Sequence, residues 1–416
     1  MFYKRDIFSD FYKHLLEKEI TVLLGPRQAG KTTLLKVAKD KLIKQGVTPE
    51  NIFYFNLDLV TDRQNFRDQP EFIRFIKQRV GKKRIFLFID EAQRVDNCGL
   101  FFKGVYDLEL NIKLVLTGSS SLDLKSKLHE SLAGRKKIFH LLPFSFEEYL
   151  KTQTRLNLKN FPDFSKSDKQ SIWEIFESYL LFGGYPKLIK KPMEKKIDYL
   201  TDLFNSYVEK DIVSFLKIRQ VDGFIRLVRL LGSQIGQTIN IQELSSTLAI
   251  DRKTIEAYLL YLEQTFVTKR IRPFFKNYRK ELTKLPRIFF YDLGLRNFSL
   301  ENFKSFNKRT DKGQLLENFI LQVLASLKRR KIYFWRTVDG NEVDFVLQRL
   351  DGEIIPVEIK SARLSKPAIG RGYRHFLSFY RPKKAFLVNL GLRKVVSLGK
   401  TKVVFCLPFE LKRELE

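Results

Sequence analysis

The strongest constraint on this chain is the stretch from Leu23 to Thr33, which reads LLGPRQAGKTT. An apolar, partly β-branched run over residues 20–24 precedes it, as is typical of a buried strand. Apolar residues at helical spacing follow it over residues 31–44. A strand, a G-x-x-x-x-G-K-T loop and a helix make a P-loop, in which inward-pointing N–H groups and the helix N-terminus hold a polyphosphate. The stretch therefore predicts an ATP site.

The P-loop also predicts roles for individual residues. The ammonium of Lys31 should reach the β- and γ-phosphates, and the hydroxyl of Thr32 should ligate Mg²⁺. ATP and Mg²⁺ are therefore the expected cofactors. The expected nucleotide-binding residues form one continuous segment: Gly25, Pro26, Arg27, Gln28, Ala29, Gly30, Lys31, Thr32 and Thr33.

A second motif lies about 60 residues later. The apolar run IFLFI over residues 85–89 is followed directly by Asp90 and Glu91, which is a Walker B pattern. Asp90 should orient Mg²⁺ or its water, and Glu91 should polarise the attacking water. Both carboxylates should lie beside the P-loop, because the carboxyl ends of parallel strands meet at one edge of a sheet.

A further strand over residues 112–117 ends in the sequence TGSSS. Thr117 or Ser119 could sense the γ-phosphate or hold the water, although a plain serine-rich turn would also explain the sequence. Strands and helices alternate up to about residue 145. This order predicts an α/β domain with a parallel sheet over residues 1–145.

Length and charge indicate how many domains the chain has and what kind of partner it binds. A chain of 416 residues with 44% hydrophobic residues is long enough for several packed cores. Residues 1–150 hold 26 basic and 19 acidic side chains, whereas the remaining 266 residues hold 50 and 28. The later domains therefore carry most of the positive charge, which favours a polyanion such as DNA as partner, unless the surface is lysine-rich throughout.

The cysteine content, the first residues and the apolar runs indicate where in the cell the protein resides. Only two cysteines are present, the start of the chain is no signal peptide, and no apolar run is long enough to cross a bilayer. We therefore expect a cytoplasmic protein without a membrane partner.

Several motifs together resemble the prokaryotic AAA-type ATPases that carry a C-terminal domain of unknown function with a nuclease-like fold. The motifs are the P-loop, FIDEAQ over residues 88–93, TGSS over 117–120, the AGR that ends at Arg135, and LPFSFEEY over 142–149. The resemblance implies an AAA+ core, a helical lid over residues 146–220, a winged helix-turn-helix over 221–304 and a nuclease-like domain over 305–416. It also implies that Arg135 is the charge placed against the γ-phosphate, in its own subunit or in the next one of a homo-oligomer.

The expected lid contains the turn FGGYP over residues 182–186. This turn is similar to one in AAA-related ATPases that closes on the adenine, which would make Gly184 and Pro186 nucleotide-binding residues. Glycines allow close backbone approach, and proline fixes the start of the next helix. A plain turn between two helices remains the alternative.

The segment after residue 221 has the pattern of a winged helix. Helices are expected over residues 239–250 and 251–263, and a strand over 267–275. Arg252 and Lys253 open the expected recognition helix, where contacts to DNA usually fall. Lys269, Arg270 and Arg272 on the strand complete the expected DNA contacts, although a winged helix can also serve only as a protein interface.

The last domain carries an ordered set of charged residues. Glu317 lies near the start of a helix, Asp344 lies on a strand, and Glu358 and Lys360 lie on the next strand. This order resembles the restriction-endonuclease-like nucleases. Asp344 and Glu358 could share a divalent metal, and Lys360 could stabilise charge or lower the pKa of a water. A retained fold that binds without cutting is the alternative.

These patterns together predict an ATP-hydrolysing AAA+ protein that couples its nucleotide state to DNA binding, with metal-dependent DNA cleavage as an added activity. The alternative is an ATP-dependent switch, in which the nuclease-like domain recognises nucleic acid or a partner but does not cut.

Overall fold

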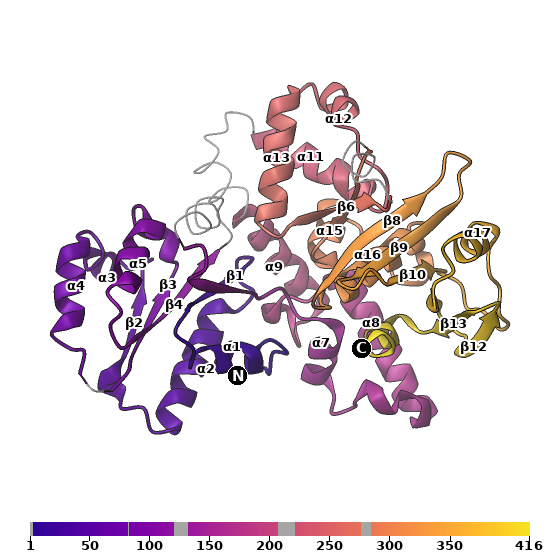
Figure 1. Ribbon diagram of the computed structural model, residues 1–416. Coiled ribbons are helices and arrows are strands. Elements are labelled where there is room, and N and C mark those ends of the chain that lie inside the picture. Colours follow the sequence, from indigo (N-terminus) through magenta and orange to yellow (C-terminus); the bar gives the residue numbers. More distant parts are fainter. Residues whose placement is uncertain (1–2, 82, 120–131, 207–220, 276–283) are drawn as a thin grey trace. The chain divides into compact units, whose positions relative to one another are not determined.

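The computed structural model describes residues 3–81, 83–119, 132–206, 221–275 and 284–416 (Figure 1). The chain forms two compact units, which we describe one at a time. Unit 1 contains Met1–Phe144 with Gln264–Phe266, and unit 2 contains Ser145–Glu263 with Val267–Glu416. Apart from residues 264–266, the segments 146–220, 221–304 and 305–416, which the sequence analysis treats as three domains, are thus grouped in unit 2.

Unit 1 is built on a five-stranded sheet in the order β2-β3-β4-β1-β5. All four neighbouring pairs are parallel, which confirms the predicted parallel α/β fold. Because β1, β3 and β4 are inner strands, their side chains are buried on both faces, which explains their continuous apolar sequences. The strands are β1 (Ile20–Gly25), β2 (Ile52–Asn56), β3 (Ile85–Asp90), β4 (Ile112–Ser119) and β5 (Lys136–His140).

Helices connect these strands, and an aromatic core fills the space beside β2. Phe66, Phe72 and Phe101 pack with ring centroids 4.6–5.8 Å apart. The helices are α1 (Phe8–His14), α2 (Lys31–Lys44), α3 (Val60–Gln64), α4 (Gln69–Lys77) and α5 (Cys98–Asp107), with the 3₁₀ turns η1 (Pro49–Asn51) and η2 (Ala92–Arg94).

Unit 2 combines helices with one mixed sheet in the order β12-β13-β11-β10-β9-β8-β6-β7. Strand β6 pairs antiparallel with β7 and parallel with β8. The strand expected over residues 267–275 is observed as β6, and it joins β7 to the sheet of the C-terminal segment. The strands are β6 (Thr268–Pro273), β7 (Arg287–Phe290), β8 (Arg330–Arg336), β9 (Glu342–Arg349), β10 (Ile354–Ile359), β11 (Lys384–Val388), β12 (Lys394–Leu398) and β13 (Thr401–Cys406).

The central strands of this sheet are buried. Val343, Phe345 and Val346 of β9 are fully covered, and Tyr373 and Phe376 of α17 pack against the sheet. The helices of unit 2 are α7 (Phe146–Gln153), α8 (Lys166–Phe182), α9 (Met193–Ser206), α11 (Val221–Ser233), α12 (Ile241–Leu248), α13 (Arg252–Gln264), α15 (Leu293–Ser299), α16 (Lys312–Ala325), α17 (Arg371–Tyr380) and α18 (Leu411–Leu415). The 3₁₀ turns are η3 (Leu158–Asp163), η4 (Pro186–Leu188), η6 (Phe306–Lys308) and η7 (Pro408–Glu410).

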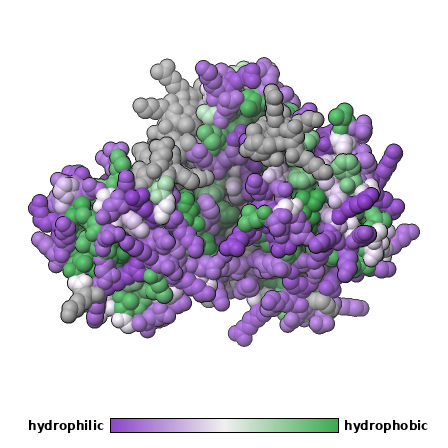
Figure 2. All heavy atoms as spheres, in the orientation of Figure 1, coloured by the Kyte–Doolittle hydropathy of each residue, from purple (hydrophilic) through white to green (hydrophobic). Residues whose placement is uncertain are grey.

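The visible surface is mostly hydrophilic, with apolar residues in scattered patches (Figure 2). Among the described residues, none of the helices combines the length and the apolar character needed to span a bilayer.

A buried charge network joins α15 to the start of α16. Asp311 accepts hydrogen bonds from Arg296 at 2.5 Å and from Arg309 at 2.8 Å, and both guanidinium groups are almost completely buried. Burial alone would raise the pKa of Asp311, but the two guanidinium groups outweigh it and lower the pKa to about 2. Asp311 is therefore the counter-charge that makes burial of two arginines tolerable.

We expect Asp311→Ala to lower the free energy of unfolding by about 3–5 kcal/mol, because two buried cations would lose their counter-charge. Urea unfolding measures this, and Asp339→Ala, which removes an exposed carboxylate, should stay within about 0.5 kcal/mol. The native pKa of Asp311 lies below its ordinary value of 3.8. Ionised Asp311 therefore contributes about 2 kcal/mol to the free energy of unfolding above pH 4, and this contribution is lost as the pH falls toward 2. Equal acid sensitivity in the variant would contradict this assignment.

Candidate functional site

The P-loop of unit 1 joins the carboxyl end of β1 to the start of α2, as predicted. Gly30 and Gln28 adopt left-handed backbone angles, with φ of 99° and 60°. A Cβ atom on Gly25 would lie 2.1 Å from the carbonyl oxygen of Leu141, so only glycine fits there. Arg5, which the sequence analysis missed, supports the loop by donating to the carbonyl of Ala29 at 3.1 Å.

Lys31 is held at the loop itself. Its side chain is buried, and its ammonium donates to the carbonyl oxygens of Gly25 at 3.0 Å and Pro26 at 3.1 Å. A cation fixed over a ring of backbone N–H groups is the arrangement that binds a polyphosphate.

Asp90 is the centre of a hydroxyl cluster at the end of β3. Its Oδ2 accepts from the hydroxyls of Thr32 at 2.6 Å and Tyr54 at 2.9 Å, and its Oδ1 accepts from Thr117. Burial and the charge of Asp90 raise the pKa of Tyr54 well above its ordinary value, so the phenol stays a proton donor. Tyr54 lies on β2 and was missed, because a single tyrosine in an apolar strand carries no motif.

The oxygen atoms of Thr32 and Asp90 fit the Mg²⁺ expected beside a P-loop. Mg²⁺ prefers oxygen ligands, and it is usually held by one or two protein groups together with water and phosphate. The 2.6 Å contact between Thr32 and Asp90 brings two such oxygens together.

Glu91 is oriented by its backbone and by one neighbour. It adopts a left-handed φ of 58°, and its N–H donates to the hydroxyl of Thr117 at 3.1 Å. The amide of Gln93 donates to its Oε2 at 2.5 Å. Thr117 is thus engaged with both residues of the acid pair, and the role of Gln93 is another that the sequence analysis missed. The backbone of Ser119 pairs with Gly25, whereas its side chain lies outside the described residues.

The structure places Arg135 away from the phosphate site of its own subunit, contrary to one of the two predicted roles. Its carbonyl accepts from the N–H of Ile20 at 2.8 Å, so it lies at the amino end of β1, whereas the P-loop begins at the carboxyl end. Five residues of strand separate the two ends by about 16 Å. The guanidinium instead pairs with Asp107 at 2.8 Å. Arg135 therefore does not reach the phosphate site of its own chain, and a role toward a neighbouring subunit stays a prediction.

The glycine turn of unit 2 packs against the start of α15. The N–H of Gly184 donates to Asp292 at 2.8 Å, and a Cβ on Gly183 would lie 2.2 Å from the same carboxylate. Pro186 opens the 3₁₀ turn η4. These contacts fit the plain interhelical turn, and the contact with adenine stays a prediction.

The residues expected to contact DNA lie in two places. Arg252 and Lys253 are exposed at the start of α13. Lys269, Arg270 and Arg272 lie on β6, where Arg270 is paired with Glu263 at 2.5 Å. Helices α11 to α13 and the β6–β7 hairpin occur in the order expected of a winged helix, which itself stays a prediction.

The charged set of the C-terminal segment comes together at β9 and β10. The Oδ2 of Asp344 accepts from the N–H of Ile359 at 2.7 Å, and the Oε1 of Glu358 accepts from Lys360 at 2.7 Å. Burial and the nearby charge of Glu358 raise the pKa of Asp344 well above its ordinary value. Burial raises the pKa of Glu317 to about 7, with the charges of Glu342 and Glu358 adding to the shift. The two strands thus do not point these carboxylates apart.

Arg287 of β7 joins the same group and was also missed. It is buried and pairs with Glu342 at 2.7 Å, and its charge lowers the pKa of Glu317 and Asp344. Within the described ranges, no group of three or more histidine, cysteine or acidic side chains is arranged to hold a metal. The Oε2 of Glu358 is nevertheless buried without a hydrogen-bond partner among described residues, so it remains open to a cation.

The parallel sheet, the phosphate loop and the acid pair define unit 1 as a P-loop nucleotide-binding domain. Residues 17–150 match a family model described as an AAA domain, which supports an AAA-type ATPase domain in unit 1. Residues 174–306 and 312–409 match two models described as domains of unknown function, DUF8612 and DUF4143.

Similar proteins span most of the chain. An uncharacterized protein of Haemophilus influenzae is 26% identical over 347 residues, which cover 82% of each chain. An uncharacterized protein of Methanocaldococcus jannaschii is 28% identical over 373 residues, which cover 84% of this chain and 77% of the relative. Among solved structures, the ADP form of the Aeropyrum pernix ORC2 protein matches with a TM-score of 0.33 and 14% identity, over 64% of this chain and 85% of that one.

We expect Tyr54→Phe to weaken Mg²⁺-dependent ATP turnover by about tenfold, because the carboxylate of Asp90 loses one orienting hydroxyl, worth about 1 kcal/mol or more. The measurement is steady-state hydrolysis titrated with Mg²⁺. The control is Tyr106→Phe, since Tyr106 lies on α5 of the same unit, away from the hydroxyl cluster. An unchanged Mg²⁺ titration in Tyr54→Phe would remove this tyrosine from the site.

Proposed function

We propose that this protein binds and hydrolyses ATP in an AAA-type domain and couples its nucleotide state to DNA binding. The observation that carries the proposal is the cluster around Asp90, in which the Thr32 hydroxyl beside the P-loop meets the acid pair of β3.

Each residue of this cluster has a distinct task in hydrolysis. Lys31 exchanges its carbonyl contacts for the β- and γ-phosphates, so that negative charge is balanced where the bond breaks. Thr32 and Asp90 would hold Mg²⁺, which supplies charge neutralisation between the phosphates when bound. Glu91 accepts a proton from the attacking water, and Gln93 holds the Glu91 carboxylate in place.

DNA binding is assigned to unit 2. The sequence after residue 150 holds 50 basic and 28 acidic side chains, which supports a polyanionic partner. Arg252 and Lys253 on α13, with the basic residues of β6, would supply the phosphate contacts. A bound γ-phosphate can hold protein segments that relax when it is hydrolysed, and such a change would be the means of coupling.

Metal-dependent DNA cleavage is the second candidate activity. Asp344, Glu358 and Lys360 gather at neighbouring strands, with Glu317 close by, and the unpartnered Oε2 of Glu358 supports a cation site. The alternative is a switch in which this segment recognises nucleic acid without cutting. Arg287 and Lys360 favour it, because they already neutralise part of the acidic charge.

Two substitutions separate ATP binding from hydrolysis. We expect Lys31→Ala to abolish ATP binding, because the fixed cation at the phosphates is lost. We expect Glu91→Gln to keep wild-type affinity but to slow turnover at least a hundredfold, because the proton acceptor is lost. Calorimetric titration and single-turnover hydrolysis measure the two effects, with the exposed Lys36→Ala as control. Wild-type turnover in Glu91→Gln would make the Walker B assignment wrong.

Cleavage has its own test. If unit 2 cuts DNA, Asp344→Ala should remove Mg²⁺- or Mn²⁺-dependent nicking of plasmid DNA and leave ATP turnover unchanged, because the two sites use different residues. Asp339→Ala, at an exposed turn, is the control. Equal nicking by Asp344→Ala and wild type would assign the activity to a contaminant, and no nicking by either would support the switch.

A further inference from the structure

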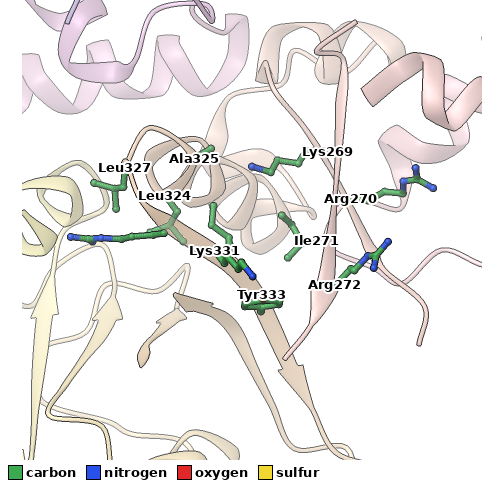
Figure 3. A pocket seen from close by; sticks show the side chains of 11 residues that line it. Lys269, Arg270, Ile271, Arg272, Leu324, Ala325, Leu327, Lys331 and Tyr333 are labelled. Carbon is green, nitrogen blue, oxygen red and sulfur yellow. The ribbon is translucent and has the colours of Figure 1, made fainter. Parts of the chain in front are cut away.

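Unit 2 contains a basic cavity of about 340 Å³, which lies between the starts of β6 and β8 and the end of α16 (Figure 3). Apolar residues of α16 and the two strands form part of its wall. No carboxylate belongs to the described lining, and five of the eleven lining residues are cationic: Lys269, Arg270, Arg272, Arg330 and Lys331. We call this site the β6–β8 basic pocket.

Successive side chains of a strand point to opposite faces, so some cations of β6 lie in the cavity and others at its rim. Figure 3 shows Lys269 and Ile271 on the side of β6 that faces α16 and Lys331, whereas Arg270 and Arg272 lie on the other side. Lys269 and Lys331 therefore extend into the space, and Arg272 flanks it.

Part of this positive charge lies near carboxylates, because Glu263 pairs with Arg270 and also acts on Lys269, but the ion pairs among the described residues are incomplete. Arg270 is paired with Glu263, but Lys269, Arg272 and Lys331 form no ion pair with any described carboxylate. Burial lowers the pKa of Lys269, which shows that its ammonium is poorly solvated. A bound anion would compensate these charges.

Arg330 adds an unsatisfied donor. Its Nη2 donates to the carbonyl of Leu415 at 2.7 Å, whereas its Nη1 is buried and has no hydrogen-bond partner in the part of the chain that the structure describes. Arg349 lies opposite Arg330 in the β8–β9 register and is paired with Glu353 at 2.8 Å, so that carboxylate is already engaged by another guanidinium group. Buried donors normally find partners, and an anion would provide one.

We propose that the β6–β8 basic pocket binds the phosphodiester backbone of a nucleic acid. This inference rests on the proposed DNA binding and locates its main phosphate contacts. Lys269 of β6 and Lys331 of the neighbouring strand β8 extend into the cavity, and Arg272 lies at its rim on the other side of β6, so the cations are spread over more than one point of the site. The cations inside the cavity and at its rim therefore suit successive phosphates of one strand.

The start of α13 is the weaker site by the same reasoning. Arg252 and Lys253 are exposed and do not belong to the lining of the β6–β8 basic pocket, and Glu256 follows Arg252 at helical i,i+4 spacing, where it reduces the local positive charge. Of the two groups of predicted DNA contacts, the structure thus favours the residues of β6, joined by those of β8, over the start of α13.

The test compares the two sites in the full chain. Binding of a short fluorescent DNA oligonucleotide is followed by anisotropy over a range of salt, with saturating Mg-ADP to occupy the P-loop. The double variant Lys269→Gln/Lys331→Gln should bind at least tenfold more weakly, and its slope of log affinity against log salt should be shallower by about two. The control is Lys394→Gln/Lys400→Gln, which removes two exposed cations of the same unit and should bind as the wild type does.

The remaining outcomes decide between the two proposals. If the pocket variant binds normally while Arg252→Glu/Lys253→Glu loses affinity, the pocket is overturned and DNA binding by α13 stands. If wild type binds no DNA, both proposals fail. If inorganic phosphate at equal phosphate concentration displaces the oligonucleotide, the pocket takes a free anion and the nucleic-acid assignment is wrong. Lys331 is exposed, so Lys331→Gln alone still tests the pocket, through a salt slope shallower by about one, if the Lys269 substitution unfolds the protein.

Discussion

The carboxylate of Asp90 is the interaction on which the catalytic half of the structure depends. It accepts hydrogen bonds from Thr32 of α2, Tyr54 of β2 and Thr117 of β4, and itself ends β3. Four elements from distant parts of the sequence are thereby fixed to one atom group. The three hydroxyl donors fix the orientation of both carboxylate oxygens, and oxygen is the ligand type that Mg²⁺ prefers. The same contacts that align the sheet edge thus fix the oxygen atoms that would hold the proposed Mg²⁺.

Unit 2 differs from unit 1 because oppositely charged side chains are buried together on the strands of its sheet. Asp344 and Glu358 interrupt apolar strands and repel each other, and Lys360 and Arg287 supply the nearest positive charges. Arg287 comes from β7, outside the segment that carries the carboxylates. The stability of the acidic group therefore depends on the hairpin that the sequence analysis assigned to a separate domain. A segment 305–416 cut away from this hairpin would lose a buried counter-charge.

Sequence reasoning succeeded where the determining residues are adjacent in the chain. The P-loop and the acid pair after β3 are local patterns, and each lies where it was predicted. It failed where two elements must meet. Tyr54 and Arg287 have no motif, because their importance comes only from a partner far along the chain. Arg135 was placed by family resemblance, but strand direction puts it at the opposite end of β5 from the phosphate loop.

The position of β6 links the two proposals for unit 2. It pairs with β7 on one side and β8 on the other, so the basic pocket and the acidic group lie on one continuous sheet. Strand β8 carries Arg330 and Lys331 at its start and pairs with β9, which carries Asp344. Hydrogen-bonded strands fix the distance between the basic pocket and the acidic group far more rigidly than a linker between domains would. A nucleic acid bound through its phosphates at β6 and β8 would therefore have a fixed position relative to Asp344 and Glu358, whether that group cuts it or only recognises it.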